Sequence, residues 1–444
     1  MKVNVILKEN NRDLFSSSEE NTFYLDSIFT DPKTSKLQNS IVEHDIYSFL
    51  TEKKDFKLCP NNLVADFSNI AMAVYAIDQT CNRDKFGYYG WSRYINLYIP
   101  VYNSQKWNSV KEELENTLSF LSGDKWVLNF RNCLEPFPNF LTSAFSPKKV
   151  CLFSGGMDSF IGISDLINKN DSLATVSHHK GGNSGELSLQ KEITNLFIEN
   201  NKNKNILPYN FYVQGKKNEI LTGEKTQRAR SILFLSLASL VANTSSKTAS
   251  IVIPENGLIS LNLPLTPARG GSHSTKTTHP KFISSLNTIF KKVGIQNMIE
   301  NPYRFLTKGE MLAKVNSNKF VLENITSTLS CSKPGYYQQW TGKSDKSVKK
   351  QCGHCVPCII RRASLYSNGL DNADDYVKNV FNSNEKYDDY NAFNIAIGRY
   401  SNLEKIKLAF LKSGYMNISE NEIKKYIKMY NRGLKEVRKF ILQK

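Results

Sequence analysis

The stretch that determines the fold runs from the apolar Val150-Cys151-Leu152-Phe153 through Ser154-Gly155-Gly156-Met157-Asp158-Ser159 into the helix-like Phe160-Ile161-Gly162-Ile163-Ser164-Asp165-Leu166. The apolar run predicts a buried strand, and the paired glycines predict a tight turn into a helix. Such a turn gathers backbone N–H groups and the positive end of a helix dipole around one point. The stretch therefore predicts a loop that holds phosphate.

The turn alone is also compatible with an ordinary strand-to-helix connection in which Ser154 caps the helix and no ligand binds. Asp158 favours the phosphate loop. A carboxylate inside an anion cradle is unfavourable unless a divalent cation or the N–H groups of the loop compensate its charge.

A second pattern consists of cysteines. Cys331 is followed at a distance by Cys352-Gly353-His354-Cys355-Val356-Pro357-Cys358. Tetrahedral zinc prefers four soft ligands, and gaps of two residues let neighbouring thiolates reach one ion. We expect a closed structural zinc site with His354 beside it as a bystander or outer hydrogen-bond donor. Four buried or redox-active thiols are the less favoured alternative, because the remaining cysteines occur singly: Cys59, Cys81, Cys133 and Cys151.

Composition favours a cytoplasmic protein without disulfides. The N-terminal residues read as a short strand and not as a secretion signal, and the longest apolar stretch, residues 231–242, is too short to span a bilayer. The 444 residues suggest two or three domains. The formal charge of +17 makes nucleic-acid binding possible. Binding is not favoured, because the basic residues are spread along the chain without interleaved aromatic residues.

The chain divides into three predicted segments. Residues 1–146 form a mixed α/β domain, residues 147–370 a catalytic domain, and residues 371–444 a helical extension. Helices are predicted at residues 68–77, 110–121, 160–166, 186–198 and 228–242, and strands at residues 1–7, 95–99, 126–130, 150–153, 173–177, 209–213 and 250–253. The alternation in the middle segment predicts an α/β fold with a doubly wound parallel sheet, whose ligand site lies beyond the carboxyl ends of the strands.

The motifs of the middle segment resemble a known family in their order. They are the glycine loop (residues 154–159), Arg228-Ala229-Arg230, Glu255-Asn256-Gly257, Pro280-Lys281-Phe282-Ile283, Thr307-Lys308-Gly309-Glu310-Met311, and Ser330-Cys331 with the cysteine knuckle (residues 352–358) followed by Ile359-Ile360-Arg361-Arg362. This order resembles the PP-loop ATP pyrophosphatases, and among them the QueC family of 7-cyano-7-deazaguanine synthases. The resemblance covers residues 148–365, about half of the chain.

The resemblance implies an ATP- and Mg²⁺-dependent ligase that activates 7-carboxy-7-deazaguanine as an acyl adenylate and forms a C–N bond. In this scheme the pyrophosphate is held by Ser154, Gly155, Gly156, Met157 and Ser159, and Asp158 orders the loop or binds the cation. Arg230 and Lys308 are the candidate phosphate contacts, unless they merely pair on a helix or cap one. His178 is the further candidate for the nucleotide, and Glu255, Asn256 and His279 are candidates for the substrate.

Two departures concern substrate handling. The synthases carry a Tyr-Gly-Gln-Arg-His type segment where this chain has His178-His179-Lys180-Gly181-Gly182-Asn183, and Asp-Cys-Arg where it has Thr277-Thr278-His279. With the long N-terminal segment, these changes are similar to the QatC-type members of anti-phage defence operons. That similarity implies an amide formed on the N-terminus of a small partner protein. The N-terminal domain and the helical extension, with its spacing of Leu403, Ile406 and Phe410, are candidate docking surfaces or a structural cap.

Three functions remain open from sequence. The first is amide formation on a partner protein in defence. The second is free nitrile synthesis with ammonia for queuosine-type nucleoside modification, or tRNA modification by a PP-loop enzyme. The third is a non-enzymatic scaffold, which the intact glycine loop disfavours.

Overall fold

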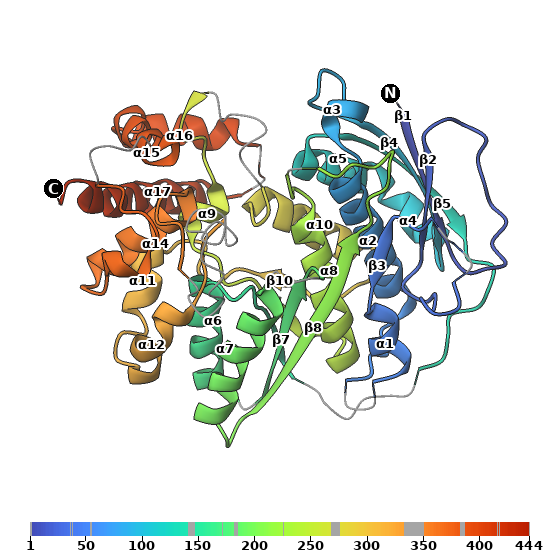
Figure 1. Ribbon diagram of the computed structural model, residues 1–444, viewed down its shortest axis with the longest axis horizontal. Coiled ribbons are helices and arrows are strands. Elements are labelled where there is room, and N and C mark those ends of the chain that lie inside the picture. Colours follow the sequence, from blue (N-terminus) through green and yellow to red (C-terminus); the bar gives the residue numbers. More distant parts are fainter. Residues whose placement is uncertain are drawn as a thin grey trace.

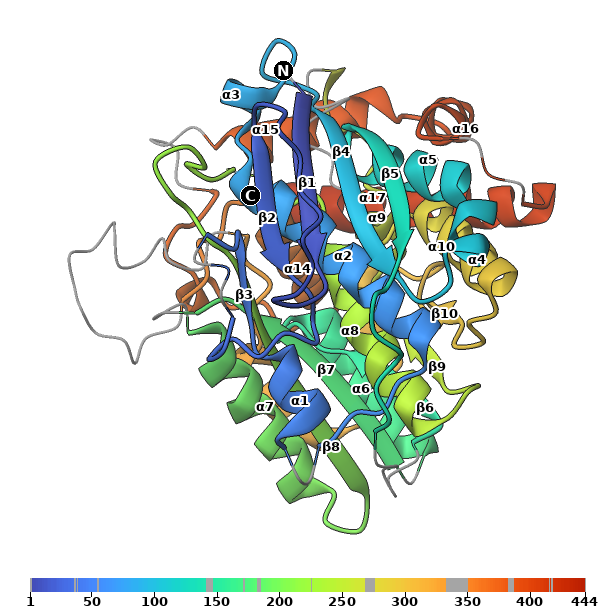
Figure 2. The same ribbon diagram turned by 90° about the vertical axis from the view of Figure 1, so that its right-hand side faces the viewer.

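The computed structural model describes residues 2–443 except 36, 38, 54, 55, 141–146, 171, 182–184, 225, 268–275, 333–349, 382–386, 415 and 417. Residues 182 and 183 of the segment 178–183 discussed above therefore lie outside the described residues, as do residues 268–275 before Thr277. Figures 1 and 2 show a sheet of N-terminal strands on one side, a central sheet, and the C-terminal helices on the opposite side.

The N-terminal segment forms a four-stranded parallel sheet in the order β2-β1-β4-β5. Its strands are β1 (Lys2–Lys8), β2 (Thr22–Asp26), β4 (Tyr94–Val101) and β5 (Lys125–Asn132). Helix α2 (Asn62–Thr80) packs against this sheet and is buried along almost its whole length. A helix that is buried on all sides lies inside the protein, so α2 is a central helix of the molecule (Figure 2).

The second sheet has six strands in the order β10-β9-β6-β7-β8-β3. Five of them are mutually parallel: β6 (Lys149–Leu152), β7 (Ser172–His179), β8 (Asn205–Gly215), β9 (Ser250–Val252) and β10 (Ile299–Glu300). The sixth, β3 (Val42–His44), comes from the N-terminal segment and is antiparallel to β8. The sheet predicted as parallel is therefore mixed, because a strand of three residues carries no periodic pattern.

Strand β6 shows why helices cover both faces of this sheet. Side chains alternate along a strand, so Val150 and Leu152 enter one core while Cys151 and Phe153 enter another. On the first face lies α8 (Arg230–Ser245), and on the second lie α6 (Met157–Lys169) and α7 (Glu186–Asn200). This arrangement leaves the carboxyl ends of the central strands free to carry a site (Figure 1).

One hydrophobic core joins the two sheets. Helix α2 contacts strand β8 of the central sheet and helix α8, which covers that sheet, and it also contacts β1 and β4 of the N-terminal sheet. Val64, Ile70 and Leu237 belong to a single buried cluster that also contains strand residues of both sheets. The N-terminal segment is therefore packed onto the same core as the glycine loop's own strand.

The C-terminal helices enclose a second core. Helices α15 (Asp388–Arg399), α16 (Leu403–Lys412) and α17 (Glu420–Ile441) pack with α9 (Gly257–Leu261) and α14 (Val356–Ser367). Ile406 and Phe410 are buried in this core, whereas Leu403 is 42% exposed. Two of the three residues of the candidate docking surface, Ile406 and Phe410, therefore already pack within the chain.

The remaining helices include two longer ones, α5 and α10, and several short ones. They are α1 (Ile46–Thr51), α3 (Arg83–Phe86), α4 (Ser104–Ser109), α5 (Lys111–Ser122), α10 (Pro280–Val293), α11 (Lys308–Ala313), α12 (Lys319–Asn324) and the 3-10 turns η2 (Ile325–Ser327) and η3 (Ala373–Asp375). Within the described part of the chain, every helix is too short or too polar to cross a lipid bilayer.

Candidate functional site

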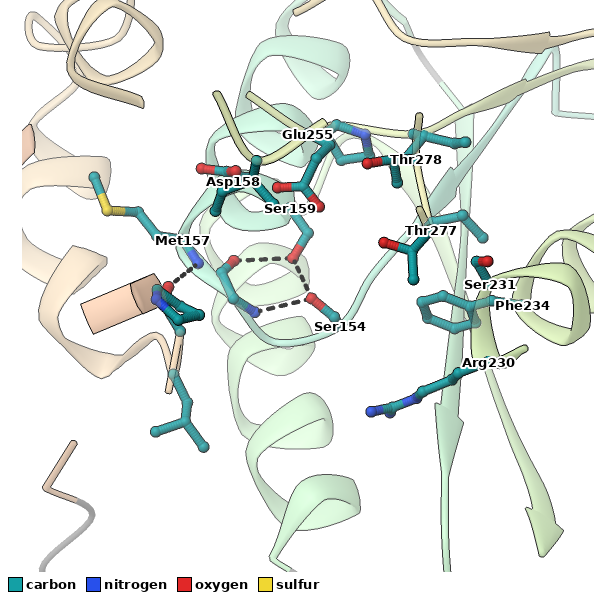
Figure 3. A pocket seen from close by; sticks show the side chains of 18 of the residues that line it. Ser154, Met157, Asp158, Ser159, Arg230, Ser231, Phe234, Glu255, Thr277 and Thr278 are labelled. Carbon is teal, nitrogen blue, oxygen red and sulfur yellow. Dashed lines mark hydrogen bonds between the residues drawn. The ribbon is translucent and has the colours of Figure 1, made fainter. Parts of the chain in front are cut away.

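The glycine loop connects β6 to α6 as a tight turn. Gly155 has φ +82°, a conformation that favours glycine, and a Cβ there would lie 3.3 Å from Cδ2 of Leu189. The amide of Gly156 donates to Oγ of Ser154 (3.3 Å), and Oγ of Ser159 donates to the carbonyl of Gly156 (2.9 Å) (Figure 3). The hydroxyls of the loop thus fix its backbone, and helix geometry leaves the first amides of α6 without intrahelical acceptors.

A cavity of about 360 Å³ opens beside this loop. Most of the predicted site residues line it: Ser154, Gly156, Met157, Asp158, Ser159, Arg230, Glu255 and Lys308. Arg230, Ser231, Phe234 and Thr277 lie across the cavity from the loop, and Thr278 lines it near Glu255 (Figure 3). The structure therefore brings together Ser154 and Lys308, which are 154 positions apart in the sequence.

Asp158 lies at the centre of a buried polar cluster. Its Oδ1 pairs with Nζ of Lys308 at 2.9 Å, and its Oδ2 accepts from Nδ2 of Asn256 at 2.6 Å and from the Asn256 amide at 3.2 Å. Burial alone would raise the pKa of Asp158, but Lys308 and these donors outweigh burial and hold the pKa below its ordinary value. Asp158 is therefore ionised and anchors the ammonium group of Lys308.

Glu255 lies next to this cluster and lines the cavity. Burial and the neighbouring charge of Asp158 raise the pKa of Glu255 well above its ordinary value. Asn256, in contrast, is fully buried and caps α9 through its Oδ1, which accepts from the Ile259 amide at 3.1 Å. Asn256 thus holds Asp158 from a buried position away from the cavity, whereas Glu255 lines the cavity.

Arg230 is held in the cavity wall by a buried histidine. Nε2 of His178 lies 2.9 Å from the carbonyl of Val213, which only accepts, so Nε2 carries the proton and Nδ1 is free to accept from Nε of Arg230 at 3.3 Å. Burial and the charge of Arg230 lower the pKa of His178, which favours this neutral form. Arg230 also donates to the carbonyl of His178 at 3.2 Å and lies 3.6 Å from Glu186.

His178 itself is completely buried and is not among the residues that line the cavity. His178 therefore lies behind Arg230 and not in the cavity wall, where the predicted nucleotide contact would place it. The strand periodicity explains the difference, because His178 points into the α2 and α8 side of the sheet, where its ring contacts those of Tyr75 and Phe234.

His279 is also placed differently from the prediction. It caps α10, with Nδ1 accepting from the Lys281 amide at 3.2 Å and Nε2 lying 3.2 Å from Oγ of Ser413. Burial, with the nearby Lys276 and Lys281, lowers the pKa of His279 to about 3. Both ring nitrogens are engaged outside the cavity, and the residues of this segment that line the cavity are Thr277 and Thr278.

Four cysteines form a candidate metal centre. The Sγ atoms of Cys331, Cys352, Cys355 and Cys358 all lie within 4.8 Å of one another. Cys331 and Cys355 are 4.0 Å apart, and Cys352 and Cys358 are 3.8 Å apart. A tetrahedral zinc ion with Zn–S bonds of about 2.3 Å requires sulfur atoms about 3.8 Å apart. The spacing of the four sulfur atoms therefore fits zinc. The His354 ring stacks on Tyr387, with ring centroids 5.1 Å apart.

Two residues of α17 that no sequence pattern indicates hold the residues around Lys308 in place. Glu436 accepts from Oγ1 of Thr307 at 2.7 Å and from the Gly309 amide at 3.2 Å, and Arg432 donates to Glu310 at 2.6 Å. These groups fix the first turn of α11, which begins at Lys308. Thr307 and Glu436 are 129 positions apart, so no local pattern links them.

No protein-family model and no curated protein matches the sequence.

Proposed function

We propose that this protein binds ATP in the cavity beside the glycine loop, cleaves it between the α and β phosphates, and so activates a carboxylate for C–N bond formation. The observation that carries the proposal is the convergence of the α6 amino terminus, Lys308 and Arg230 on one cavity. Backbone amides on one side of a cavity and cations on its walls are suited to a polyphosphate, whose charge extends over several phosphate groups.

The chemistry follows from where charge develops. A carboxylate oxygen of the substrate attacks the α phosphorus, the bond from that phosphorus to the bridging oxygen breaks, and pyrophosphate leaves with the additional charge. The amides of the loop, Lys308 and Arg230 would stabilise that charge. An amine then attacks the acyl carbon, AMP leaves, and the amine loses a proton as the amide forms.

Magnesium would supply further neutralisation of the phosphate charge when bound. Carboxylate oxygens are the ligands that Mg²⁺ prefers. Glu255 and Asp158 present two carboxyl groups close together, and a negative charge on one disfavours a negative charge on the other. A bound divalent cation would relieve this repulsion. These two residues are therefore the ones that would hold it.

The resemblance to the QueC family supports a 7-deazaguanine carboxylate as the acid, and the similarity to the QatC type supports the N-terminus of a partner protein as the amine. The cavity wall agrees with a planar substrate, because Phe234 offers a ring and Ser231, Thr277 and Thr278 offer hydroxyl groups. The zinc is assigned a structural role.

The test is incubation with ATP, Mg²⁺ and 7-carboxy-7-deazaguanine, with and without ammonia and with co-purified proteins, followed by mass spectrometry. AMP and pyrophosphate with a mass increment on a partner chain are expected. A free amide or nitrile that forms with ammonia alone selects nucleoside biosynthesis instead. ADP in place of AMP, or no nucleotide turnover with any acid, overturns the proposal.

A further inference from the structure

A short segment, residues 328–331, connects the glycine loop to the cysteine cluster. The amide of Leu329 donates to the carbonyl of Gly155 at 2.9 Å. The amide of Met157, the first residue of α6, donates to Oγ of Ser330 at 3.3 Å (Figure 3). Ser330 and Cys331 both line the cavity. One side of this segment thus contacts the loop that we assign to phosphate.

The other side of the same segment is held by the cysteine knuckle. Gln351, next to Cys352, accepts from the Ser330 amide at 3.0 Å and donates to the Thr328 carbonyl at 3.1 Å. The amide of Cys352 donates to Sγ of Cys331 at 3.5 Å. A metal ion that binds Cys331 and Cys352 together would therefore also fix the position of Ser330 between them and the loop.

We propose that the cysteine cluster and the phosphate loop are energetically coupled through residues 328–331, and that Ser330 is a further residue of the anion site. The inference rests on the proposed function only in taking the loop as a site for a polyphosphate. Because Oγ of Ser330 accepts from the Met157 amide, its own O–H remains available as a donor on the cavity side. Ser330 thus offers a hydroxyl donor in place of the Met157 amide that it binds, beside the amides of Asp158 and Ser159.

The coupling has a definite sign. Metal binding orders residues 328–331 and with them the acceptor for the Met157 amide and the Leu329 bond to Gly155. An anion that binds this ordered loop favours the ordered segment in turn. Coupling between two sites is reciprocal, so zinc strengthens anion binding and a bound anion slows the loss of zinc.

The test uses the full chain with zinc bound and pyrophosphate as the probe. We expect pyrophosphate to slow the transfer of zinc to a colorimetric chelator several-fold. Ser330→Ala should keep one zinc per chain, weaken pyrophosphate binding in calorimetry about 3- to 10-fold, the range for one lost hydrogen bond, and abolish the effect on zinc release. Ser330→Thr should retain both effects, and Ser332→Ala, at an exposed position, should behave as the unmodified protein.

The outcomes separate the inference from the proposed function. If neither pyrophosphate nor ATP binds the zinc-loaded protein, both fail. If pyrophosphate binds but zinc release is unchanged in its presence, the coupling alone is overturned and the nucleotide site stands. The release measurement on the unmodified protein is decisive even if Ser330→Ala folds poorly.

Discussion

At the scale of single residues, the site depends on how buried charges are matched. Asp158 remains ionised in the interior because Lys308 lies 2.9 Å away and Asn256 donates twice to the other oxygen. An ion pair inside a protein is costly to break, because the remaining partner is left buried and unpaired. Asp158 therefore fixes the position of the Lys308 ammonium group toward the cavity.

We predict that Asp158→Ala lowers ATP-dependent AMP formation about 100-fold or more, since Lys308 loses its anchor and the leaving pyrophosphate loses a positioned cation. Release of AMP and pyrophosphate measures the effect. Asp165→Asn on the same helix is the control, because Asp165 accepts from the Tyr303 hydroxyl outside the cavity at 2.8 Å and asparagine keeps an acceptor there. Unchanged AMP formation by the Asp158 variant would remove the site assignment.

At the scale of elements, two helix ends hold the functional groups. Helix α11 starts at Lys308 and is fixed by Glu436 of α17. Helix α14 starts directly after Cys355 and contains Cys358 in its first turn. In both cases the first turn of a helix, and not a loop tip, carries the side chain of the candidate site, namely Lys308 or Cys358. A helix holds such side chains more rigidly than a loop does.

Glu436 gives this part of the protein a pH dependence. Burial raises the pKa of Glu436 to about 7 from an ordinary 4.5, so the folded state binds this proton more tightly than the unfolded state. The resulting contribution to stability is complete below pH 4.5 and is lost as the pH rises through 7.

We predict that Glu436→Gln reduces the fall in the free energy of unfolding between pH 5 and pH 8 by about 2 to 3 kcal/mol, as measured by urea titrations at both pH values. Glu404→Gln, at an exposed position on α16, should leave the fall unchanged. An identical pH dependence for Glu436→Gln and the unmodified protein contradicts the assignment.

For the cysteine knuckle, we predict that Cys355→Ser lowers the zinc content below one per chain and destabilises the fold by about 3 kcal/mol or more, because three thiolates bind zinc weakly. Metal analysis and thermal unfolding check this. Cys59→Ser, outside the cluster, serves as the control, and full zinc retention with unchanged melting in Cys355→Ser would argue against a four-cysteine site.

At the scale of the whole molecule, a buried ionic cluster connects the N-terminal segment to the site. Arg93 donates to Asp124 at 3.1 Å and to Asp78 at 3.1 Å, and Arg83 donates to the same two carboxylates. The other oxygen of Asp78 accepts from the Ala229 amide at 2.9 Å, immediately before α8 and Arg230. The N-terminal segment therefore supports the cavity wall through α8.

We predict that Asp78→Ala lowers the free energy of unfolding by about 3 to 5 kcal/mol, because it leaves two buried guanidinium groups with one carboxylate fewer. Urea denaturation measures the loss. Glu420→Ala removes an exposed partner of Lys424 and should change stability little. Equal effects of the two substitutions would show that the cluster is not a buried network.

The sequence by itself determined the parts whose residues lie close together along the chain. Strand β6, the glycine turn and the start of α6 follow from apolar runs and paired glycines, and three of the four clustered cysteines lie within seven residues. Most predicted helices and strands agree with the structure, because long apolar stretches such as those of α2 and α8 are visible in the sequence itself.

Only the tertiary structure decided the rest. It turned His178 away from the cavity and assigned His279 to capping a helix, so that Thr277 and Thr278 face the cavity in its place. It also brought β3, Glu436 and Ser330 to positions that no local pattern indicates. The physical reason is that these contacts join residues far apart in the chain, and the packing of whole elements on a shared core decides which of them meet.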